Sequence, residues 1–324
     1  NYLPGMNRAH NPIFHNKKII NRSYQSQGIS RDKIIRKGVL LRDREEYLTD
    51  LLADRAVSFI EKNKDRPFLC YLPFNAIHGP FQAPEDLYDK YASEKDHARR
   101  LNLAMIDSLD QNVGKVLTAL DRLDLADDTL VVFLSDNGGH EASRNLPLRG
   151  KKATYWEGGL RVPFCLKWPA RLKAGEAYRK PVIALDLLPT FVRAAGGEIE
   201  PDWKLDGVDL MPYLTGGKKG FPHADLYWTW GTRKALRAGN LKALSQDDGK
   251  TWQLYDLAKD KSETNDLSSK RGKKLDSMKE RFLRWEKSLM PQQWGWNPKL
   301  GYKDPEFGKP RLYHKPGYFE QDKP

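Results

Sequence analysis

Apolar residues recur along this chain in two patterns, one with the period of a helix and one with the continuity of a buried strand. Helical spacing predicts amphipathic helices over residues 45–63 and 97–123, and a third over 186–195 that ends at a Gly-Gly pair. Short apolar runs predict buried strands at 68–74, 129–135 and 162–168. Because strands separated by helices favour parallel pairing, we predict an α/β domain with a mostly parallel sheet and helices on both faces.

The pattern changes after about residue 215, at the segment 216–220, which is rich in glycine and lysine. Beyond this segment come short β-type runs and then an amphipathic helix, at 226–232, 234–238, 252–257 and about 270–288. They predict a small α+β unit with an antiparallel sheet. Residues 291–324, rich in proline and aromatic residues, are expected to form an extended tail that packs through its rings. The predicted domains are therefore 1–215, 216–290 and the tail 291–324.

Charge narrows the choice of partner. The chain carries 55 Lys and Arg against 43 Asp and Glu, a net charge of +12, which favours polyanions such as nucleic acids, anionic membranes or sulfated sugars. The basic residues are dispersed, and no zinc-finger spacing or RNA-binding aromatic motif occurs, so no nucleic-acid partner is expected. No apolar run reaches the roughly 18 residues of a membrane span. The two cysteines, Cys70 and Cys165, lie in apolar runs and are expected to be buried free thiols.

Two of the predicted strands lead into loops with chemically useful side chains. Asp136 and Asn137 follow strand 129–135 and offer two hard oxygen ligands, which suit Ca²⁺ or Mg²⁺ better than a soft metal. His78 follows strand 68–74 and can donate a proton to a leaving group near neutral pH. Parallel strands share a carboxyl edge, so these residues are expected to face one crevice. An Asx turn and a structural histidine are the alternative interpretations.

A third loop, residues 148–163, holds Lys151 and Lys152 among glycines. Paired lysines in such a loop can clamp a tetrahedral oxyanion. An ordinary solvated basic loop has the same composition, so this segment alone does not decide between the two interpretations.

Taken together, the three loops resemble a known family. The sequence has His-x-Pro at 78–80, Ser-Asp-Asn-Gly at 135–138 and Arg-Gly-x-Lys-x₄-Glu-Gly-Gly at 149–159, in that order. This order resembles the formylglycine-dependent sulfatases of the alkaline-phosphatase-like superfamily, in particular the bacterial polysaccharide and aryl sulfatases. Further similar segments, within a resemblance that covers about residues 67–290, are 183–190, 207–214 and the Leu-Tyr-Asp-Leu motif at 254–257 with Asp260, Glu263 and Asn265.

The resemblance implies a role for each catalytic candidate. Asp136 and Asn137 correspond to two of the family's metal ligands, usually for Ca²⁺. His78 corresponds to the histidine that contacts the sulfate and assists the leaving group. The family's lysine, which holds a sulfate oxygen and stabilises developing charge, lies five residues before the Glu of Glu-Gly-Gly, and here that residue is Lys152. Lys151 stands where the family usually has glycine.

The resemblance also implies secondary roles. His140 and Asn145 lie in a stretch that often shapes the sugar subsite, and with Lys151 they are candidates for substrate binding. Arg149, Glu157 and Asp186 are expected to serve the scaffold.

The sequence departs from the family in one region. The family's nucleophile arises from the Cys or Ser of Cys/Ser-x-Pro-x-Arg, which is modified to formylglycine, and no such motif occurs in the 324 residues. The family's Asp-Asp metal pair and Gly-Lys-Trp-His element are missing too. All of these belong to the family's amino-terminal stretch, which we expect to precede residue 1. The chain alone is therefore expected to be catalytically inactive and to bind metal weakly.

The expected function of the intact protein is hydrolysis of sulfate esters on a sulfated carbohydrate or an aryl group. A phosphatase or phosphodiesterase on the same fold, or a non-catalytic fragment that binds sulfated glycans, stays open. The phosphatases typically bind two zinc ions through extra Asp and His ligands, and no Asp-His pair follows strand 129–135. The family implies a periplasmic or secreted location, although no signal peptide is visible.

Overall fold

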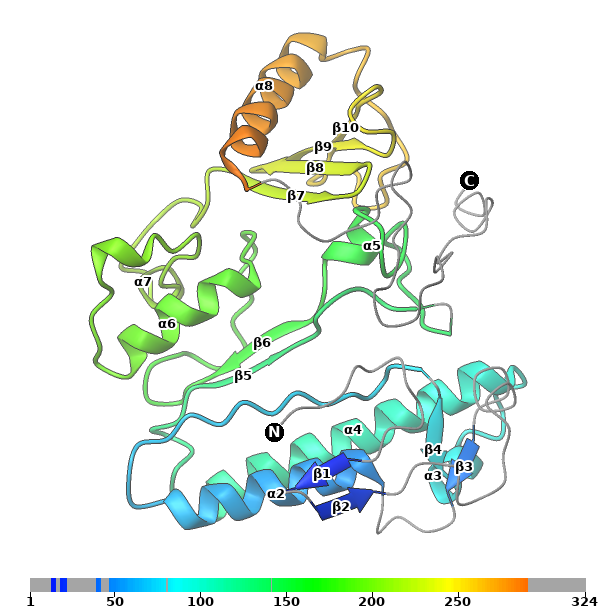
Figure 1. Cartoon of the computed structure of the whole chain (residues 1–324), viewed down its shortest axis with the longest axis vertical. Coiled ribbons are helices and arrows are strands. Elements are labelled where there is room, and N and C mark those ends of the chain that lie inside the picture. Colours follow the sequence, from blue (N-terminus) through cyan, green and yellow to red (C-terminus); the bar gives the residue numbers. More distant parts are fainter. Residues whose placement is uncertain are drawn as a thin grey trace. The chain divides into compact units, whose positions relative to one another are not determined.

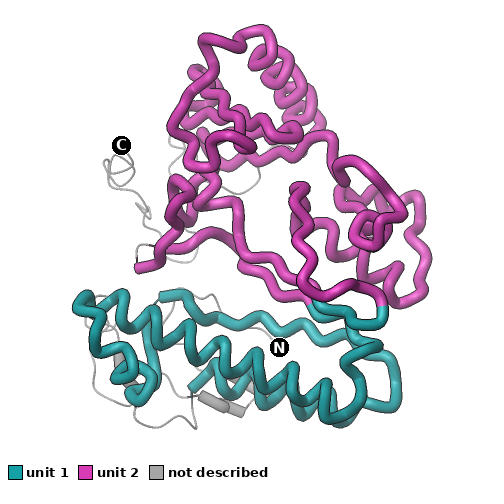
Figure 2. Tube along the Cα trace, turned by 180° about the vertical axis from the view of Figure 1, so that it is seen from behind, with its two compact units in different colours: residues 1–131, 167–170 teal, residues 132–166, 171–324 magenta. Residues whose placement is uncertain are grey.

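The structure is a computed structural model, and it describes residues 13–15, 18–21, 39–41, 47–79, 81–140 and 142–290 (Figure 1). The chain divides into two compact units (Figure 2). Unit 1 comprises the chain up to Val131 together with Lys167–Ala170, and unit 2 comprises Val132–Leu166 and the chain from Arg171 onward.

Two long helices form the centre of unit 1. Helices α2 (Leu48–Asn63) and α4 (His97–Arg122) lie side by side, as Figure 1 shows, and both confirm the predicted helices. Helix α4 begins at Asp96, whose carboxylate accepts a hydrogen bond from the backbone N–H of Arg99 at 2.7 Å and so caps the first turn. Helix α3 (Glu85–Lys90) and strand β4 (Gln82–Pro84) pack against α4 around a small buried apolar cluster of Ala83, Leu87, Leu101, Ala104 and Met105.

The strands of unit 1 are short. Strands β1 (Ile13–His15) and β2 (Lys18–Asn21) pair antiparallel, whereas β3 (Val39–Leu41) pairs with β4 in parallel. Within the described residues, β3 and β4 are the one pair assigned as parallel, so the predicted mostly parallel sheet is not found there.

The predicted strand at 68–74 is wrong. This segment is extended but joins no sheet among the described residues, and exposed positions alternate with half-buried ones. Leu69 is 74% exposed and Tyr71 is 85% exposed. A continuous apolar run indicates burial on both faces, and here only one face lies against the protein. The expectation of buried cysteines is also wrong, because Cys165 is exposed and Cys70 is half-buried, with burial raising the pKa of its thiol. Both are free thiols, as expected.

Unit 2 begins with a strand pair that carries the predicted metal loop. Strands β5 (Val131–Leu134) and β6 (Phe164–Lys167) confirm two predicted strands and form a two-stranded sheet. The expectation that these strands are buried is wrong, because their residues are half-buried or exposed. The backbone N–H of Ser135 donates to the carbonyl oxygen of Pro163 at 3.2 Å, so the end of β5 lies beside the start of β6. The short helix α5 (Glu157–Leu160) precedes β6.

A group of short helices follows β6. The segment before Asp186 leads through the 3₁₀ turn η2 (Ala184–Asp186) into α6 (Leu187–Ala194), which confirms the predicted helix and ends before Gly196. The turn η3 (Pro201–Trp203) and helix α7 (Met211–Leu214) complete this group.

The C-terminal part is a four-stranded antiparallel sheet with one helix. Its strands, in the order β10-β9-β8-β7, are β7 (Leu226–Trp230), β8 (Arg233–Ala238), β9 (Leu241–Ser245) and β10 (Gln253–Asp256). Helix α8 (Gly272–Ser288) packs Met278 and Phe282 against the sheet. The sheet and its helix confirm the predicted α+β unit, although the sequence pattern missed β9.

The predicted tail, residues 291–324, lies outside the described residues. Within the described part of the chain, no helix has the length and apolar character that crossing a membrane requires.

Candidate active site

Two of the three predicted loops meet in unit 2. The backbone N–H of Gly138 donates to the carbonyl oxygen of Gly159 at 2.9 Å, and that of Lys152 donates to the carbonyl oxygen of Gly139 at 2.9 Å. These bonds join the loop that follows β5 to α5 and to the loop that precedes α5. The structure therefore brings the Asp136–Asn137 segment and the Lys151–Lys152 segment together.

The glycines of these loops permit the close approach. A Cβ atom at Gly138 would collide with the carbonyl oxygen of Gly158, and one at Gly158 would collide with the carbonyl oxygen of Gly150. Gly159 is equally enclosed, by the backbone of Lys151 and Thr154. The Glu-Gly-Gly motif thus has a steric cause, because its two glycines lie directly against the backbone of residues 149–154, and Gly138 approaches Gly158 from the other loop.

Asn145 ties the two loops further. Its Oδ1 accepts from the N–H of Gly139 at 3.0 Å, and its Nδ2 donates to the carbonyl oxygens of Gly139 at 3.3 Å and Gly150 at 3.2 Å. With both ends of the carboxamide engaged by backbone, this geometry favours a positioning role. Contact of Asn145 with substrate stays a prediction.

Both lysines of the third loop are half-buried. The hydroxyl of Thr154 donates to the carbonyl oxygen of Lys151 at 2.7 Å, which closes a tight turn around Lys152 and Ala153. Ala153 has a φ of +66°, in the left-handed region. The separate roles assigned to Lys152 and Lys151 remain predictions.

The proposed metal ligands offer a donor set of the right chemistry. Asp136 is exposed at the end of β5, and the hydroxyl of Ser135 fixes the turn by donating to the carbonyl oxygen of Asn137 at 2.9 Å. A carboxylate beside a side-chain amide fits Ca²⁺, but it supplies only two of the roughly six to eight oxygen ligands that this ion takes. No group of three or more His, Cys, Asp or Glu residues that could hold a metal occurs among the residues described.

His78 belongs to unit 1, so its place beside the other candidates stays a prediction. Its Nδ1 lies 2.6 Å from the carbonyl oxygen of Gly79, which can only accept, so Nδ1 carries the proton of that bond. Nε2 is then the nitrogen that can exchange a proton with a substrate. The backbone N–H of His78 donates to the carbonyl oxygen of Asn75 at 2.9 Å. His140 is exposed, and its carbonyl oxygen accepts from the N–H of Ser143 at 2.9 Å.

The sequence reasoning missed a buried charge cluster next to residues 148–163, which we call the lysine loop. The Lys242 ammonium on β9, 0% exposed, lies 3.0 Å from Oε1 of Glu157 and 2.8 Å from Oε1 of Glu263. The second of these contacts is an ion pair without hydrogen-bond geometry. Oε2 of Glu263 accepts from the backbone N–H of Glu157 at 2.6 Å, at the first residue of α5. The cluster anchors the start of α5 to the C-terminal sheet.

The scaffold roles expected of Arg149 and Glu157 fit this arrangement. The Arg149 guanidinium lies over the Trp156 ring, 3.8 Å from its centroid, and donates to the carbonyl oxygen of Glu263 at 3.1 Å. Trp156 packs edge-on against Tyr255 of β10, with centroids 5.6 Å apart. Sequence analysis offered one indication of Glu263: it accompanies the Leu-Tyr-Asp-Leu motif that is similar to the family. The resemblance gave Glu263 no role.

Asp186 also holds the scaffold. Its buried carboxylate accepts from the backbone N–H groups of Ile183 and Val208, both at 2.9 Å, and lies 2.7 Å from Nε2 of His223. It thereby joins η2 to the segments before α7 and β7.

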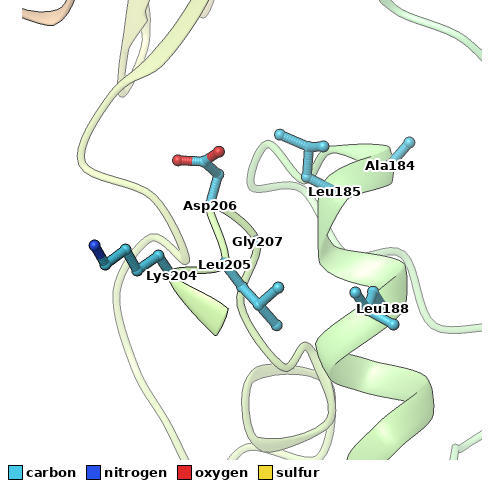
Figure 3. A pocket seen from close by; sticks show the side chains of 7 residues that line it. All are labelled: Ala184, Leu185, Leu188, Lys204, Leu205, Asp206 and Gly207. Carbon is cyan, nitrogen blue, oxygen red and sulfur yellow. The ribbon is translucent and has the colours of Figure 1, made fainter. Parts of the chain in front are cut away.

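A pocket of about 310 Å³ lies beside η2 and α6, and Figure 3 shows the side chains around it. Leu185 and Leu188 face the segment 204–207 across the opening. None of the predicted site residues lines this pocket, so it is separate from the candidate active site.

Comparison with known proteins decides the family. The family model described as Sulfatase matches residues 7–197, which is more than half of the chain. The chain belongs to the sulfatase family. A second model, the C-terminal part of N-sulphoglucosamine sulphohydrolase, matches residues 150–287 of this sulfatase.

Curated relatives agree with this assignment. The chain is 37% identical over 195 residues to mouse steryl-sulfatase, which corresponds to 56% of the chain and 30% of the relative. It is 36% identical over 189 residues to the uncharacterized sulfatase YdeN of Escherichia coli, which corresponds to 56% of the chain and 33% of the relative. The chain thus spans about a third of the length of these relatives.

Solved structures show the same likeness. The structure titled Ps i-CgsB in complex with k-i-k-neocarrahexaose has a TM-score of 0.73 and 33% identity, and the match covers 78% of this chain and 58% of that one. The phosphonate monoester hydrolase of Agrobacterium radiobacter has a TM-score of 0.59 and 20% identity, with 76% and 61% covered, and it shares the fold alone.

Proposed function

We propose that the protein hydrolyses sulfate esters and that its substrate is a sulfated carbohydrate. The observation that carries the proposal is the backbone pairing of the two loops, which joins the loop of Asp136 and Asn137 to the loop of Lys152 in a member of the sulfatase family. An ammonium group, together with a cation that the two oxygen ligands would hold, suits the tetrahedral oxyanion of a sulfate ester.

Each of these residues has a defined task in the proposed mechanism. Asp136 and Asn137 would hold Ca²⁺, with Mg²⁺ as the alternative, and the bound ion would supply positive charge for the sulfate group. Lys152 donates hydrogen bonds to a sulfate oxygen and stabilises the charge that develops there in the transition state. His78 passes a proton from Nε2 to the oxygen of the departing alcohol, so that it leaves neutral.

The nucleophile of the proposed mechanism is a formylglycine. No Cys/Ser-x-Pro-x-Arg occurs in the 324 residues, so we place this residue upstream of Asn1 in the whole protein. The chain by itself is then expected to bind sulfate without cleaving its esters.

Charge and likeness both favour a sulfated glycan. The net charge of +12 attracts polyanionic sugars and strengthens their encounter at low salt. The neighbour with 33% identity is titled as a complex with an oligosaccharide, a neocarrahexaose. A periplasmic or secreted location, where such polymers occur, is part of the proposal.

The test compares sulfate and phosphate esters. The protein extended upstream to the nucleophile motif is expected to release sulfate from a sulfated oligosaccharide and from 4-nitrophenyl sulfate, and the 324-residue chain is not. Asp136→Ala is expected to abolish the stimulation by Ca²⁺. Turnover of 4-nitrophenyl phosphate with no sulfate release from either ester would replace the proposal with a phosphatase or phosphodiesterase.

A further inference from the structure

An aromatic and a basic side chain stand opposite each other at the end of the β7–β8 hairpin. Trp230 and Arg233 are direct cross-strand partners on either side of the turn. The guanidinium of Arg233 lies 5.1 Å from the centroid of the Trp230 ring, within the range of a cation–π contact. Trp230 is nevertheless 41% exposed.

Strand alternation places both side chains on the face of the sheet that carries the lysine loop. Side chains two residues apart share a face, so Trp230 lies on the side of Trp228, and Arg233 on the side of Ala235. Trp228 and Ala235 pack in one cluster with Trp156 of the lysine loop. The opposite face of the sheet packs against α8.

A direct bond ties the hairpin to the loop. The Arg233 guanidinium donates to the carbonyl oxygen of Ala153 at 2.7 Å, and Ala153 directly follows Lys152. The exposed ring of Trp230 therefore sits close to the loop of Lys152, the lysine that the proposed function assigns to sulfate.

The charge around the hairpin is positive. Arg233 adds to Lys151 and Lys152, and burial raises the pKa of the nearby Tyr155 to about 12, so that its hydroxyl stays neutral. Asp248, whose N–H donates to the carbonyl oxygen of Thr232 in the turn, lies 3.3 Å from Lys234, which also pairs with Glu286 at 2.6 Å, so the positive charge belongs to Arg233 and the two lysines of the loop. A flat apolar ring beside basic groups suits a sugar that carries sulfate, since the ring accepts the C–H face of the sugar and the cations attract its sulfate.

We propose that Trp230 and Arg233 form a second glycan subsite, which binds the sugar next to the one whose sulfate lies at Lys152. A single exposed tryptophan is common on protein surfaces. Trp230 differs because its cross-strand partner Arg233 donates a hydrogen bond to the carbonyl oxygen of Ala153 in the lysine loop. The inference rests on the proposed function, and it commits to a sulfated oligosaccharide as the occupant.

The test is calorimetric binding of a sulfated oligosaccharide and of its desulfated counterpart to the full protein with its nucleophile removed by substitution, so that the ester stays intact during the titration. Trp230→Ala is expected to weaken binding of the sulfated oligosaccharide about tenfold, and Trp230→Tyr to retain most of the affinity. Wild type should bind the desulfated sugar more weakly. Trp203→Ala is the matched control, because Trp203 in η3 is 44% exposed and lies outside the hairpin.

Kinetics give an independent readout. In Trp230→Ala, kcat/KM for the oligosaccharide is expected to fall about tenfold more than kcat/KM for 4-nitrophenyl sulfate, which has no second sugar. Unaltered binding in Trp230→Ala, an equal loss in Trp203→Ala, or no binding by wild type would overturn the subsite. Binding that depends on Trp230 without release of sulfate from any ester would instead contradict the proposed function and leave the subsite standing.

Discussion

Replacing Lys242 with methionine is expected to lower the free energy of unfolding by about 3–5 kcal/mol. The substitution keeps most of the side-chain volume and removes the charge. Lys242 is fully buried, and its ammonium lies 3.0 Å from Glu157 and 2.8 Å from Glu263. Both carboxylates are almost completely buried, so neither can turn to water when the lysine is lost. Glu157 keeps the Arg237 guanidinium 3.6 Å from its Oε2, so the cost of an uncompensated buried charge falls mainly on Glu263.

The loss should depend on pH with a definite sign. Burial raises the pKa of the Glu263 carboxyl above its usual value, and the Lys242 ammonium opposes this increase. A carboxyl whose folded-state pKa is raised favours the folded protein at low pH, and this contribution is lost as pH rises through the folded-state pKa. Without Lys242 the pKa of Glu263 should rise further. The destabilisation by Lys242→Met is therefore expected to be largest at neutral pH and to shrink as the pH is lowered.

The assay is urea denaturation of wild type and variants at about pH 7 and about pH 5. Lys279→Met is the matched control, because Lys279 pairs with Asp276 at 3.3 Å on the exposed face of α8 and should cost less than about 1 kcal/mol. The double change Lys242→Met, Glu263→Gln should recover part of the loss, since Glu263 then carries no charge and Glu157 keeps the Arg237 guanidinium at 3.6 Å. A loss for Lys242→Met no greater than for the control, or one that grows toward acid, would refute the reasoning.

The remaining predictions concern the loop crossing and the C-terminal core. Gly158→Ala should destabilise the protein by about 1–3 kcal/mol and reduce sulfate release, because the added Cβ meets backbone atoms that cannot move away. The control Gly114→Ala, where the Cβ has open space on α4, should be neutral or slightly stabilising; thermal melting measures both variants. Asn145→Ala should cost about 1–3 kcal/mol, because the N–H of Gly139 and the carbonyl oxygen of Gly150 lose the Asn145 carboxamide, and it should lower kcat more than it raises KM. Phe282→Ala, fully buried between α8 and the sheet, should cost about 3–5 kcal/mol by urea denaturation, and a loss below about 1 kcal/mol would contradict the packing.

The long helices could be predicted from the sequence because a single apolar stripe decides their position. Helices α2, α4 and α8 follow such stripes closely. Strand β9 was missed because Lys242 interrupts its apolar run, and only the carboxylates of Glu157 and Glu263 explain a lysine there. The segment 68–74 was wrongly predicted as a strand, since apolar residues indicate burial but do not supply a neighbouring strand.

The candidate site, too, has parts that the sequence predicts and parts that only the structure shows. Asp136, Asn137 and Lys152 could be named because their chemistry and spacing form local motifs. The bond from Arg233 to Ala153 joins residues 80 positions apart and leaves no local pattern. The role of Asn145 as a tie between two loops depends likewise on backbone groups that only the folded chain brings together.

The central claim is that Lys152, held by the crossing of the two loops, binds the sulfate of an ester that the protein hydrolyses. The most direct test measures the steady-state rate of sulfate release by the whole protein, including its nucleophile motif. The rate is compared between the variants Lys152→Met and Lys151→Met. Both lysines are half-buried in the same loop, so the pair is matched for position and charge. Lys152→Met is expected to lower kcat by roughly 10²–10³-fold, as the loss of a donor to the developing charge does, and Lys151→Met by far less. Equal losses in the two variants, or a larger loss for Lys151→Met, would contradict the account.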